Sequence, residues 1–323
     1  MRKIIIDTDT GSDDAVAILM AMFSEEIEVC AITTVSGNCH LEQATKNCLQ
    51  TLEIANTYYP PVYKGSHKPL FRDLFTAKGV HGEDGMGDQS LIHPTIKHHD
   101  GHAVDKILEL IKKYPYEIEI ITLGPLTNIA KAILLDKDTM SQVKQIYSMG
   151  TSGLGPGNCT PVSEFNVYVD AESYKVLLES GIPMTIIGFD ICLGDSALQR
   201  KEIDLLMESE NKTAHFAIQC NQRLYQYNLE NTGQEFIDLP DPIAMGVLLW
   251  PEIVEKELKT HAKVMTNQDE TYGQVIFYGD KRLVLANQYQ SLDKNVSLVT
   301  KINHALFKTK LINILKNSQK NST

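Results

Sequence analysis

Basic residues are scarce in this sequence relative to acidic ones. Its 323 residues include 30 Lys and Arg against 41 Asp and Glu, which gives a formal net charge of −11 at pH 7. A surface that follows a phosphate backbone needs clustered Lys and Arg side chains, so this balance argues against nucleic acid polymers as partners. The chain also lacks any apolar run of the roughly 18 to 20 residues that span a bilayer, and no signal-peptide pattern precedes the apolar stretch that begins at Lys3. We therefore expect a protein that acts in the cytoplasm and not at a membrane.

Cysteine is also sparse, and its spacing carries no motif. The six cysteines include no CxxC pair, and a chain of this length buries enough apolar surface to fold without disulfides. We expect all of them to be reduced thiols, as in a cytoplasmic protein. The histidines at positions 93, 98, 99 and 102 lie in a polar stretch without a recognised zinc-ligand spacing, which favours a solvated loop over a zinc site.

Short apolar runs alternate with helical patterns along most of the chain. Apolar residues at spacings of three and four predict amphipathic helices at residues 13–24, 41–56, 101–114, 126–136 and 170–181. The runs before and between them predict strands at residues 3–7, 28–37, 118–126, 145–150 and 184–190. This alternation predicts an α/β fold with a mostly parallel, Rossmann-like sheet flanked by helices. The length of the chain allows one large domain or two smaller ones, and we expect a single large domain at residues 1–315. In such a fold, binding groups gather beyond the carboxyl ends of the strands.

Three stretches stand apart from this alternation. The glycine-rich segment GVHGEDGMGD (79–88) predicts a mobile loop, and its position in a long insertion is typical of a functional lid. Residues 271–290 predict a hairpin with a Gly-Asp turn, most simply an edge ribbon of the sheet. Residues 316–323, KNSQKNST, predict a frayed polar tail.

The stretch IIIDTDTGSDDAVAIL (4–19) places Asp7, Asp9, Asp13 and Asp14 where the first strand ends. Carboxylates this close raise one another's pKa unless a cation lies among them. Oxygen ligands without Cys or His favour calcium or magnesium over zinc. Helix capping and the helix dipole account for Asp13 and Asp14, but not easily for Asp7 and Asp9. The sequence therefore predicts a site for a hard divalent cation.

Three known motifs resemble this acidic stretch to different degrees. An EF-hand loop that starts at Asp7 needs Glu at its twelfth position, and that position is Ile18. Haloacid-dehalogenase-type phosphotransferases begin with DxD after a first strand and use magnesium, but DTDTG has glycine where that family usually has threonine or valine. The third motif is DxDxGxDDAxA, and DTDTGSDDAVA (7–17) matches every fixed position of it. It is the N-terminal signature of the inosine-uridine nucleoside hydrolase family, which this sequence resembles.

The resemblance continues along the chain, from residue 3 to about residue 310. Seven further segments look like the successive motifs of that family, in the same order: AITTVSGN (31–38), HGEDGMG (81–87), LGPLTNIA (123–130), MG (149–150), GN (157–158), EFNVYVDAES (164–173) and DPIA (241–244). A lone DxDxG is a weak signal, whereas an ordered series is specific. The resemblance implies the nucleoside hydrolase fold and the hydrolysis of the N-glycosidic bond of free ribonucleosides to ribose and base, in nucleoside salvage.

The resemblance also implies roles for individual residues. Asp9, Asp14 and Asp241 would bind one calcium ion together with the main-chain carbonyl of Leu123, and Asp9 would also be the general base toward water. The substrate would be held by Asp13, Asn38, Met149, Asn158, Glu164 and Asn166, with His81 near the ribose or the base. A ring of oxygen acceptors suits the oxocarbenium-like charge that the sugar develops in the transition state. Asp7 would orient the loop or a ligand water without contacting the cation itself, and Asn128 would be a structural residue at a helix N-terminus.

One position departs from the family pattern. Many members have histidine just before the last metal aspartate, where it protonates the departing base, but this sequence reads DLPDP (238–242) and has Pro240 there. Because proline carries no proton to donate, the candidates are His81, Asp238, Tyr225 and Tyr227, unless the base leaves without help. Tyrosines of the segment 221–236 would stack on the base or serve packing. The preferred base stays open among purine, pyrimidine and modified nucleosides such as queuosine.

Two other functions remain as alternatives at this point. One is the magnesium-dependent phosphotransferase of the haloacid dehalogenase type. The other is a non-catalytic nucleoside or ribose sensor, which has kept the metal site and lost leaving-group activation at Pro240. By resemblance to the family, we also expect a homodimer or homotetramer.

Overall fold

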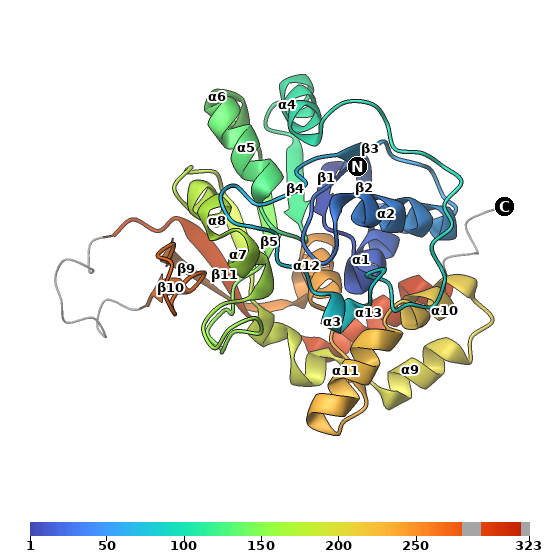
Figure 1. Ribbon diagram of the computed structural model, residues 1–323. Helices are drawn as coiled ribbons and strands as arrows, with labels where there is room; N and C mark the ends of the chain where they lie inside the picture. Colours follow the sequence, from blue (N-terminus) through green and yellow to red (C-terminus); the bar gives the residue numbers. More distant parts are fainter. Residues whose placement is uncertain (280–291, 318–323) are drawn as a thin grey trace.

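The isoleucine-rich run near the N-terminus forms strand β1 (Arg2–Thr8) in the interior of a nine-stranded sheet. The computed structural model, shown in Figure 1, describes residues 1–279 and 292–317. Ile4, Ile5 and Ile6 have no exposed surface. Strands covered on both faces read as continuous apolar runs and not as alternating ones, which explains this pattern.

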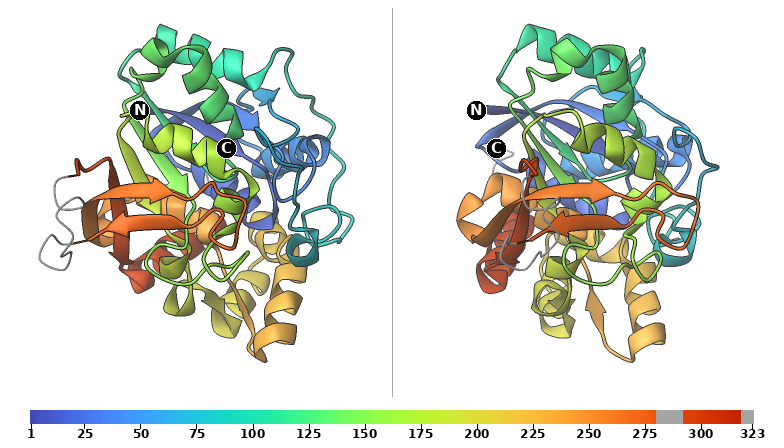
Figure 2. Two further views of the ribbon diagram at one scale, coloured as in Figure 1. Left: turned by 60° about the vertical axis from the view of Figure 1, so that its left-hand side comes forward. Right: turned by 90° about the vertical axis from the view of Figure 1, so that its left-hand side faces the viewer.

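The sheet has the strand order β10-β9-β11-β6-β5-β4-β1-β2-β3. Seven of its strands are parallel: β1, β2 (Ile27–Thr34), β3 (Val62–Lys64), β4 (Ile118–Thr122), β5 (Gln145–Met149), β6 (Met184–Ile187) and β11 (Val296–Ile302). The order β3-β2-β1-β4-β5-β6 is that of doubly wound dinucleotide-binding folds. Figure 2 shows the antiparallel ribbon of β9 (Val254–Val264) and β10 (Val275–Tyr278) at one edge. A separate two-stranded sheet pairs β7 (Leu198–Gln199) with β8 (Phe236–Ile237).

Helices cover both faces of the large sheet and bury a separate apolar core on each (Figure 1). One layer contains α1 (Ser12–Met22), α2 (Leu41–Ala55), α10 (Lys212–Gln219), α12 (Pro240–Leu249) and α13 (His304–Asn317). The other contains α4 (Ala103–Lys113), α5 (Thr127–Leu135), α6 (Lys137–Met140) and α8 (Ala171–Leu178). The remaining helices are α3 (Lys78–His81), α7 (Phe165–Val169), α9 (Arg200–Met207), α11 (Gln222–Thr232), and the short 3₁₀ segments η1 (Phe189–Cys192), η2 (Gly194–Ser196) and η3 (Pro251–Ile253).

The α/β fold and all five strands and five helices predicted from the apolar pattern are confirmed, with ends that differ by a few residues. The prediction for residues 79–88 was incomplete, because that segment contains the end of helix α3. β10 pairs with β9, which precedes it, and the second strand expected in the hairpin falls at residues 280–291, outside the described part. Helix α13 extends to residue 317, and the rest of the expected polar tail also lies outside.

The structure also describes the pairing of the cysteines and the length of the helices. The six cysteines are all unpaired, as predicted. Within residues 1–279 and 292–317, no helix combines the length and the apolar character that crossing a membrane requires.

Candidate active site

The acidic segment lies where the connections from neighbouring strands diverge to opposite faces of the sheet. The chain leaves β1 toward α1 on one face, whereas it leaves the adjacent β4 toward α5 on the other face. Such a switch point opens a crevice beyond the carboxyl ends of the strands. Asp9 follows β1, Asn38 follows β2, and Leu123 follows β4, so the topology alone brings these distant segments together.

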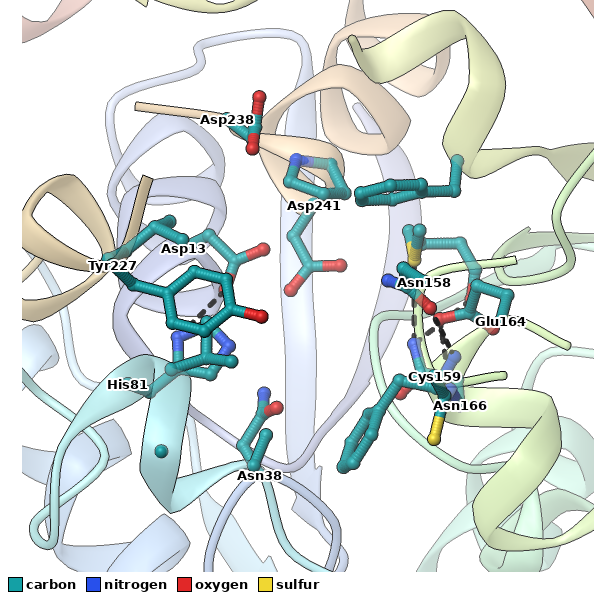
Figure 3. A pocket seen from close by; sticks show the side chains of 18 of the residues that line it. Asp13, Asn38, His81, Asn158, Cys159, Glu164, Asn166, Tyr227, Asp238 and Asp241 are labelled. Atoms are coloured by element: carbon teal, nitrogen blue, oxygen red, sulfur yellow. Dashed lines mark hydrogen bonds and ion pairs between the residues drawn. The ribbon is translucent and has the colours of Figure 1, made fainter. Parts of the chain in front are cut away.

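Three carboxylates gather at the base of this crevice. Oxygen atoms of Asp13, Asp14 and Asp241 lie within 4.8 Å of one another. Asp13 and Asp14 are in the first turn of α1, and Asp241 is in the first turn of α12, which packs against α1. Figure 3 shows Asp13 and Asp241 facing the same space.

This cluster is electrostatically costly as it stands. Burial raises the pKa of Asp13 and of Asp14 to about 6, and for Asp14 the charge of Asp13 adds to the effect. Burial followed by the charges of Asp13 and Asp14 raises the pKa of Asp241 well above its usual range. Asp13 Oδ1 is buried and has no hydrogen-bond partner in the part of the chain that the structure describes. Buried carboxylates with open oxygens are a donor set that fits a hard divalent cation.

Asp9 is held beside this cluster by close backbone contacts. The main-chain N–H of Asn38 donates to Asp9 Oδ2 at 2.6 Å, whereas Asp9 Oδ1 has no hydrogen-bond partner among the described residues. A Cβ atom at Gly37 would lie 2.1 Å from Asp9 Oδ2, and one at Gly124 would lie 2.4 Å from Asp9 Oδ1. Both glycines are therefore required by the position of this carboxylate. Burial and the charge of Asp14 raise the Asp9 pKa well above its usual range.

Asp14 is fixed by three donors. Thr8 Oγ1 donates to its Oδ1 at 2.5 Å, and the Gly11 N–H and Asn38 Nδ2 donate to its Oδ2 at 2.8 and 3.1 Å. The sequence assigned Asn38 to the ribose. In the structure Asn38 lines the cavity but also supports Asp14, so its two roles are combined.

A cavity of about 480 Å³ opens above the carboxylates. In Figure 3, His81, Tyr227 and Asp13 lie on one side of it, and Asn158, Glu164 and Asn166 on the other, with Asp238 at one end. Its described lining contains no Lys or Arg, but four carboxylates. Those carboxylates are Asp13, Glu164, Asp238 and Asp241, and the apolar lining includes Phe75, Leu123, Met149, Cys159, Phe165, Phe189 and Leu224.

The wall that carries Glu164 is built around the start of helix α7. Glu164 caps that helix: its Oε1 accepts from the Asn166 N–H at 2.9 Å, and its Oε2 accepts from the Thr151 and Val167 N–H groups at 3.1 and 3.2 Å. Burial nevertheless raises the pKa of Glu164 to about 7. Asn158 Oδ1 accepts from the main-chain N–H that follows Glu164, at 2.9 Å. These hydrogen bonds fix the side chains of Glu164 and Asn158, which the sequence analysis assigned to the sugar.

Asn166 joins this wall to the end of strand β4. Its Nδ2 donates to the Leu123 carbonyl at 2.8 Å and to the Met149 carbonyl at 3.4 Å. A carbonyl oxygen has two lone pairs, so the Leu123 carbonyl keeps one for a cation. The Met149 side chain lines the cavity, as the sequence predicted.

His81 extends from helix α3 toward the start of α1. Its Nδ1 lies 2.8 Å from Ser12 Oγ and 3.9 Å from Asp13 Oδ1. Burial lowers the pKa of His81 to about 4, which leaves the imidazole neutral at pH 7. The ring lines the cavity beside Tyr227 (Figure 3).

Asp238 and Pro240 come from the segment that leads into α12. Pro240 is the first residue of that helix, where a missing N–H costs nothing, and its ring lines the cavity. Asn228 Nδ2 donates to Asp238 Oδ2 at 3.3 Å, and Asp238 Oδ1 is buried with no hydrogen-bond partner within residues 1–279 and 292–317. Burial raises the pKa of Asp238 to about 6, against the hydrogen bond from Asn228, which lowers it.

The structure does not bring Tyr225 to the cavity. Its hydroxyl donates to Glu235 at 2.8 Å and contacts Arg200, on the outside of helix α11. Tyr225 and Tyr227 are two positions apart, and residues at that spacing point in different directions from a helix. The prediction that both would line the base pocket therefore fails for Tyr225.

Other residues of the motifs have supporting positions. Asp7 Oδ1 accepts from Thr33 Oγ1 at 2.5 Å and from Asn128 Nδ2 at 2.8 Å, and Asp7 does not line the cavity. Asn128 Oδ1 also accepts from the Ser66 N–H at 2.8 Å, so Asn128 links strands and loops, as expected. These contacts agree with the prediction that both residues act from behind the site.

Several contributors were not recognised in the sequence. They are Ser12, Phe75, Phe189, Leu224 and Asn228. Leu224, Tyr227 and Asn228 follow the spacing of one helix face, and that periodicity in the segment 221–236 was the available signal. For Ser12, Phe75 and Phe189 the sequence carried no such signal, because their positions depend on how distant segments pack.

Comparison with known proteins agrees with this geometry. The family model described as "Inosine-uridine preferring nucleoside hydrolase" matches residues 4–309. The chain is 36% identical to Uridine nucleosidase 1 of Arabidopsis thaliana over 255 residues, which cover 78% of this chain and 75% of that protein. It is also 36% identical to the inosine-uridine preferring nucleoside hydrolase of Leishmania major over 261 residues, which cover 79% and 81% of the two chains.

A solved structure shows the same similarity in three dimensions. A plant nucleoside hydrolase superimposes with a TM-score of 0.91 at 29% identity, over 98% of this chain and 99% of that one. The match spans the sheet, both helical layers and the segments that carry the carboxylates. The chain therefore belongs to the inosine-uridine preferring nucleoside hydrolase family and is an N-glycosyl hydrolase of ribonucleosides.

Proposed function

We propose that this chain hydrolyses free ribonucleosides to ribose and base with calcium as its cation, in nucleoside salvage. The observation that carries this proposal is the buried cluster of Asp13, Asp14 and Asp241 at the base of a cavity whose other walls offer sugar-binding groups. The described lining has no Lys or Arg, which favours an uncharged nucleoside over a 5′-phosphorylated one, because the charged side chains that a phosphate would meet there are carboxylates.

By resemblance to the family, Asp9, Asp14, Asp241 and the Leu123 carbonyl would hold the cation, whereas the carboxylates that the structure places within 4.8 Å of one another are Asp13, Asp14 and Asp241. Calcium accepts six to eight oxygen ligands in flexible geometry, including carbonyls, whereas magnesium demands a near-ideal octahedron and keeps several waters. A mixed set of fixed carboxylates and a main-chain carbonyl therefore favours calcium. When bound, the cation supplies Lewis acidity, which makes water a nucleophile at neutral pH.

The protein groups around the cation perform the other steps. The open Oδ1 of Asp9 takes a proton from the attacking water. Asp13, Asn158, Glu164 and Asn166, with Asn38, hold the ribose hydroxyls. Because Asn158, Glu164 and Asn166 are fixed by hydrogen bonds with main-chain groups, they stabilise the positive charge that builds on the sugar without reorganising.

The departing base would lie on the side of His81, Tyr227 and Asp238. Asp238, with a pKa raised to about 6 by burial and an open Oδ1, is our candidate for the proton donor in place of the missing histidine. His81 is neutral and contributes as a hydrogen-bond group, and Tyr227 offers a stacking surface. The proposal covers purine, pyrimidine and modified bases such as queuine, the base of queuosine. The two relatives named above differ in the bases that their names specify.

The test is a panel of ribonucleosides, common and modified, with ribose release measured by a reducing-sugar assay. We expect release from at least one nucleoside and none from its 5′-monophosphate. Phosphate release from a phosphomonoester without ribose release would replace this proposal with a phosphotransferase. Tight nucleoside binding in calorimetry without turnover on any member would replace it with a sensor.

We also propose that the protein acts in the cytoplasm as a homodimer or homotetramer. The unpaired cysteines support a reducing compartment, and the oligomer rests on resemblance to the family alone. Light scattering at micromolar concentration tests the oligomer, and a monomer there would contradict it.

A further inference from the structure

The hydroxyl of Ser12 forms a buried hydrogen bond with the imidazole of His81. Ser12 Oγ lies 2.8 Å from His81 Nδ1, and Ser12 has no exposed surface. Ser12 is the first residue of α1, whereas His81 ends α3, so the bond joins two segments that are 69 positions apart. Position 12 is variable in the signature DxDxGxDDAxA, so this pair is a property of the present chain and not of the signature.

The environment of the hydroxyl decides which atom donates. Among the described residues, Ser12 Oγ has no hydrogen-bond partner other than His81 Nδ1. If Nδ1 carried the proton, the buried Ser12 O–H would have no acceptor among the described residues, and an unsatisfied buried donor is destabilising. Asp13 Oδ1, the nearest carboxylate oxygen, is 3.9 Å from Nδ1, beyond hydrogen-bond distance. The serine therefore donates, and Nδ1 accepts.

The second nitrogen of the ring is available to a ligand. Within the described part of the chain, His81 Nε2 has no hydrogen-bond partner, and the ring lines the cavity beside Tyr227 (Figure 3). A neutral imidazole whose Nδ1 accepts must carry its proton on Nε2. The ring then presents one N–H donor toward the side of the cavity where the base would lie.

We propose that Ser12 is a positioning residue that fixes the Nε2–H tautomer of His81, which thereby donates a hydrogen bond to an acceptor atom of the departing base. The hydrogen bond to the base rests on the proposed function, whereas the tautomer of His81 does not. Negative charge grows on the base as the glycosidic bond breaks, so a donor aimed at a ring nitrogen or carbonyl oxygen of the base strengthens in the transition state. Purines and pyrimidines both offer such acceptors.

The tautomer is measured on the substrate-free protein by long-range ¹H–¹⁵N spectroscopy with ¹⁵N-labelled histidine, and His81 is assigned from the His81→Gln variant. We expect an unprotonated Nδ1 and a protonated Nε2 in the wild type, and a mixture of tautomers in Ser12→Ala. Ser12→Thr keeps the hydroxyl and is expected to retain the wild-type pattern. A wild-type His81 protonated on Nδ1 would overturn the proposal without any bearing on whether nucleosides are hydrolysed.

Kinetics then test the effect on the base. Ser12→Ala should lower kcat roughly tenfold with KM changed less than twofold, the signature of an interaction made mainly in the transition state. In His81→Gln the side-chain amide replaces the Nε2–H donor and has no tautomer to fix. Ser12→Ala added to His81→Gln should therefore change kcat less than twofold. An equal loss in both backgrounds would mean that Ser12 supports helix α1 and not His81, and would refute the assignment. If no nucleoside is cleaved at all, the proposed function fails while the tautomer measurement still stands.

Discussion

Asp9 is the single side chain on which the proposed chemistry depends most. Its Oδ1 is open, its Oδ2 is fixed by the Asn38 N–H, and it would serve both the cation and the attacking water. We expect Asp9→Ala to lower kcat by more than the roughly 10²- to 10⁴-fold that loss of a general base alone causes. Steady-state ribose release measures this, with circular dichroism to confirm folding. A loss below tenfold would remove Asp9 from the mechanism.

Asp238 controls the pH dependence if it protonates the base. Burial raises its pKa to about 6, and as an acid it must be protonated, so kcat/KM should fall as the pH rises through that value. In Asp238→Asn this fall of kcat/KM at high pH, the basic limb of the profile, should disappear. The rate should also drop at least a hundredfold.

Asn228→Leu is the matched variant for the pH profile of kcat/KM in Asp238→Asn. The hydrogen bond from Asn228 lowers the Asp238 pKa, so Asn228→Leu should move the basic limb to higher pH and leave it intact. A pH profile of kcat/KM that is unchanged in both variants would assign Asp238 to structure and leave the departing base to His81 or to its own chemistry.

The two tyrosines of helix α11 form a natural pair for testing base stacking. Tyr227 lines the cavity and Tyr225 does not. Stacking of an aromatic side chain on a base contributes roughly 1 to 3 kcal/mol, so Tyr227→Ala should raise KM on the order of tenfold or more. Tyr225→Ala should leave KM within twofold. Equal effects of the two substitutions would show that the helix as a whole, and not the ring of Tyr227, matters to the substrate.

At the scale of structural elements, the site is built from the turns that follow parallel strands. Two of these turns approach the Asp9 carboxylate so closely that only glycine fits, at Gly37 and at Gly124. Gly124→Ala would place a methyl group 2.4 Å from Asp9 Oδ1 and must displace the carboxylate or the turn. Because misplacement by about 1 Å can cost a hundredfold in rate, we expect kcat to fall at least tenfold.

Gly279→Ala is the control for that substitution, since a Cβ at Gly279 meets no atom of the described residues within 4 Å. It should leave kcat unchanged within twofold. Should Gly124→Ala also retain full activity, the close fit around Asp9 would have no catalytic meaning.

The elements differ in how far the sequence could predict them. Strand β1 was predictable because a buried parallel strand reads as an unbroken apolar run, and α1 because its apolar residues and acidic first turn agree. Helix α3 could not be predicted, because its four residues include Gly79 and are too few to show a helical period. Tyr225 was misplaced because the whole segment 221–236 was expected to shape the base pocket, whereas only one face of helix α11 is turned toward the cavity.

At the scale of the whole molecule, the cation would join segments that are far apart in the chain. Asp14 and Asp241 belong to helices α1 and α12, and the Leu123 carbonyl follows β4. The motifs named these residues in advance, but the Ser12–His81 and Asn228–Asp238 pairs depend on packing that no local pattern encodes. The loops and helix α11 around the base pocket are likewise positioned by tertiary contacts, so no local sequence pattern encodes which base fits it.

A cation that binds only the folded protein must stabilise it. At a hundred times its Kd, calcium would add about 2.7 kcal/mol, which corresponds to a Tm increase on the order of 5 °C for a chain of this size. Differential scanning calorimetry with calcium and with a chelator measures the increase. Asp241→Asn removes one carboxylate charge from the cluster and should lose most of the calcium-dependent increase in Tm. An equal calcium-dependent increase in Asp241→Asn would place the cation elsewhere.

The most direct test of the account is metal reconstitution of the hydrolase reaction. Wild-type protein is stripped with a chelator, its metal content is verified, and ribose release from the best nucleoside is followed as calcium or magnesium is added back. We predict a loss of at least a hundredfold on stripping, recovery with one calcium ion per chain, and weaker recovery with magnesium, while Asp241→Asn stays inactive at the same calcium concentration. Full activity in protein verified to be free of metal would contradict the claim that the buried aspartates act through a cation.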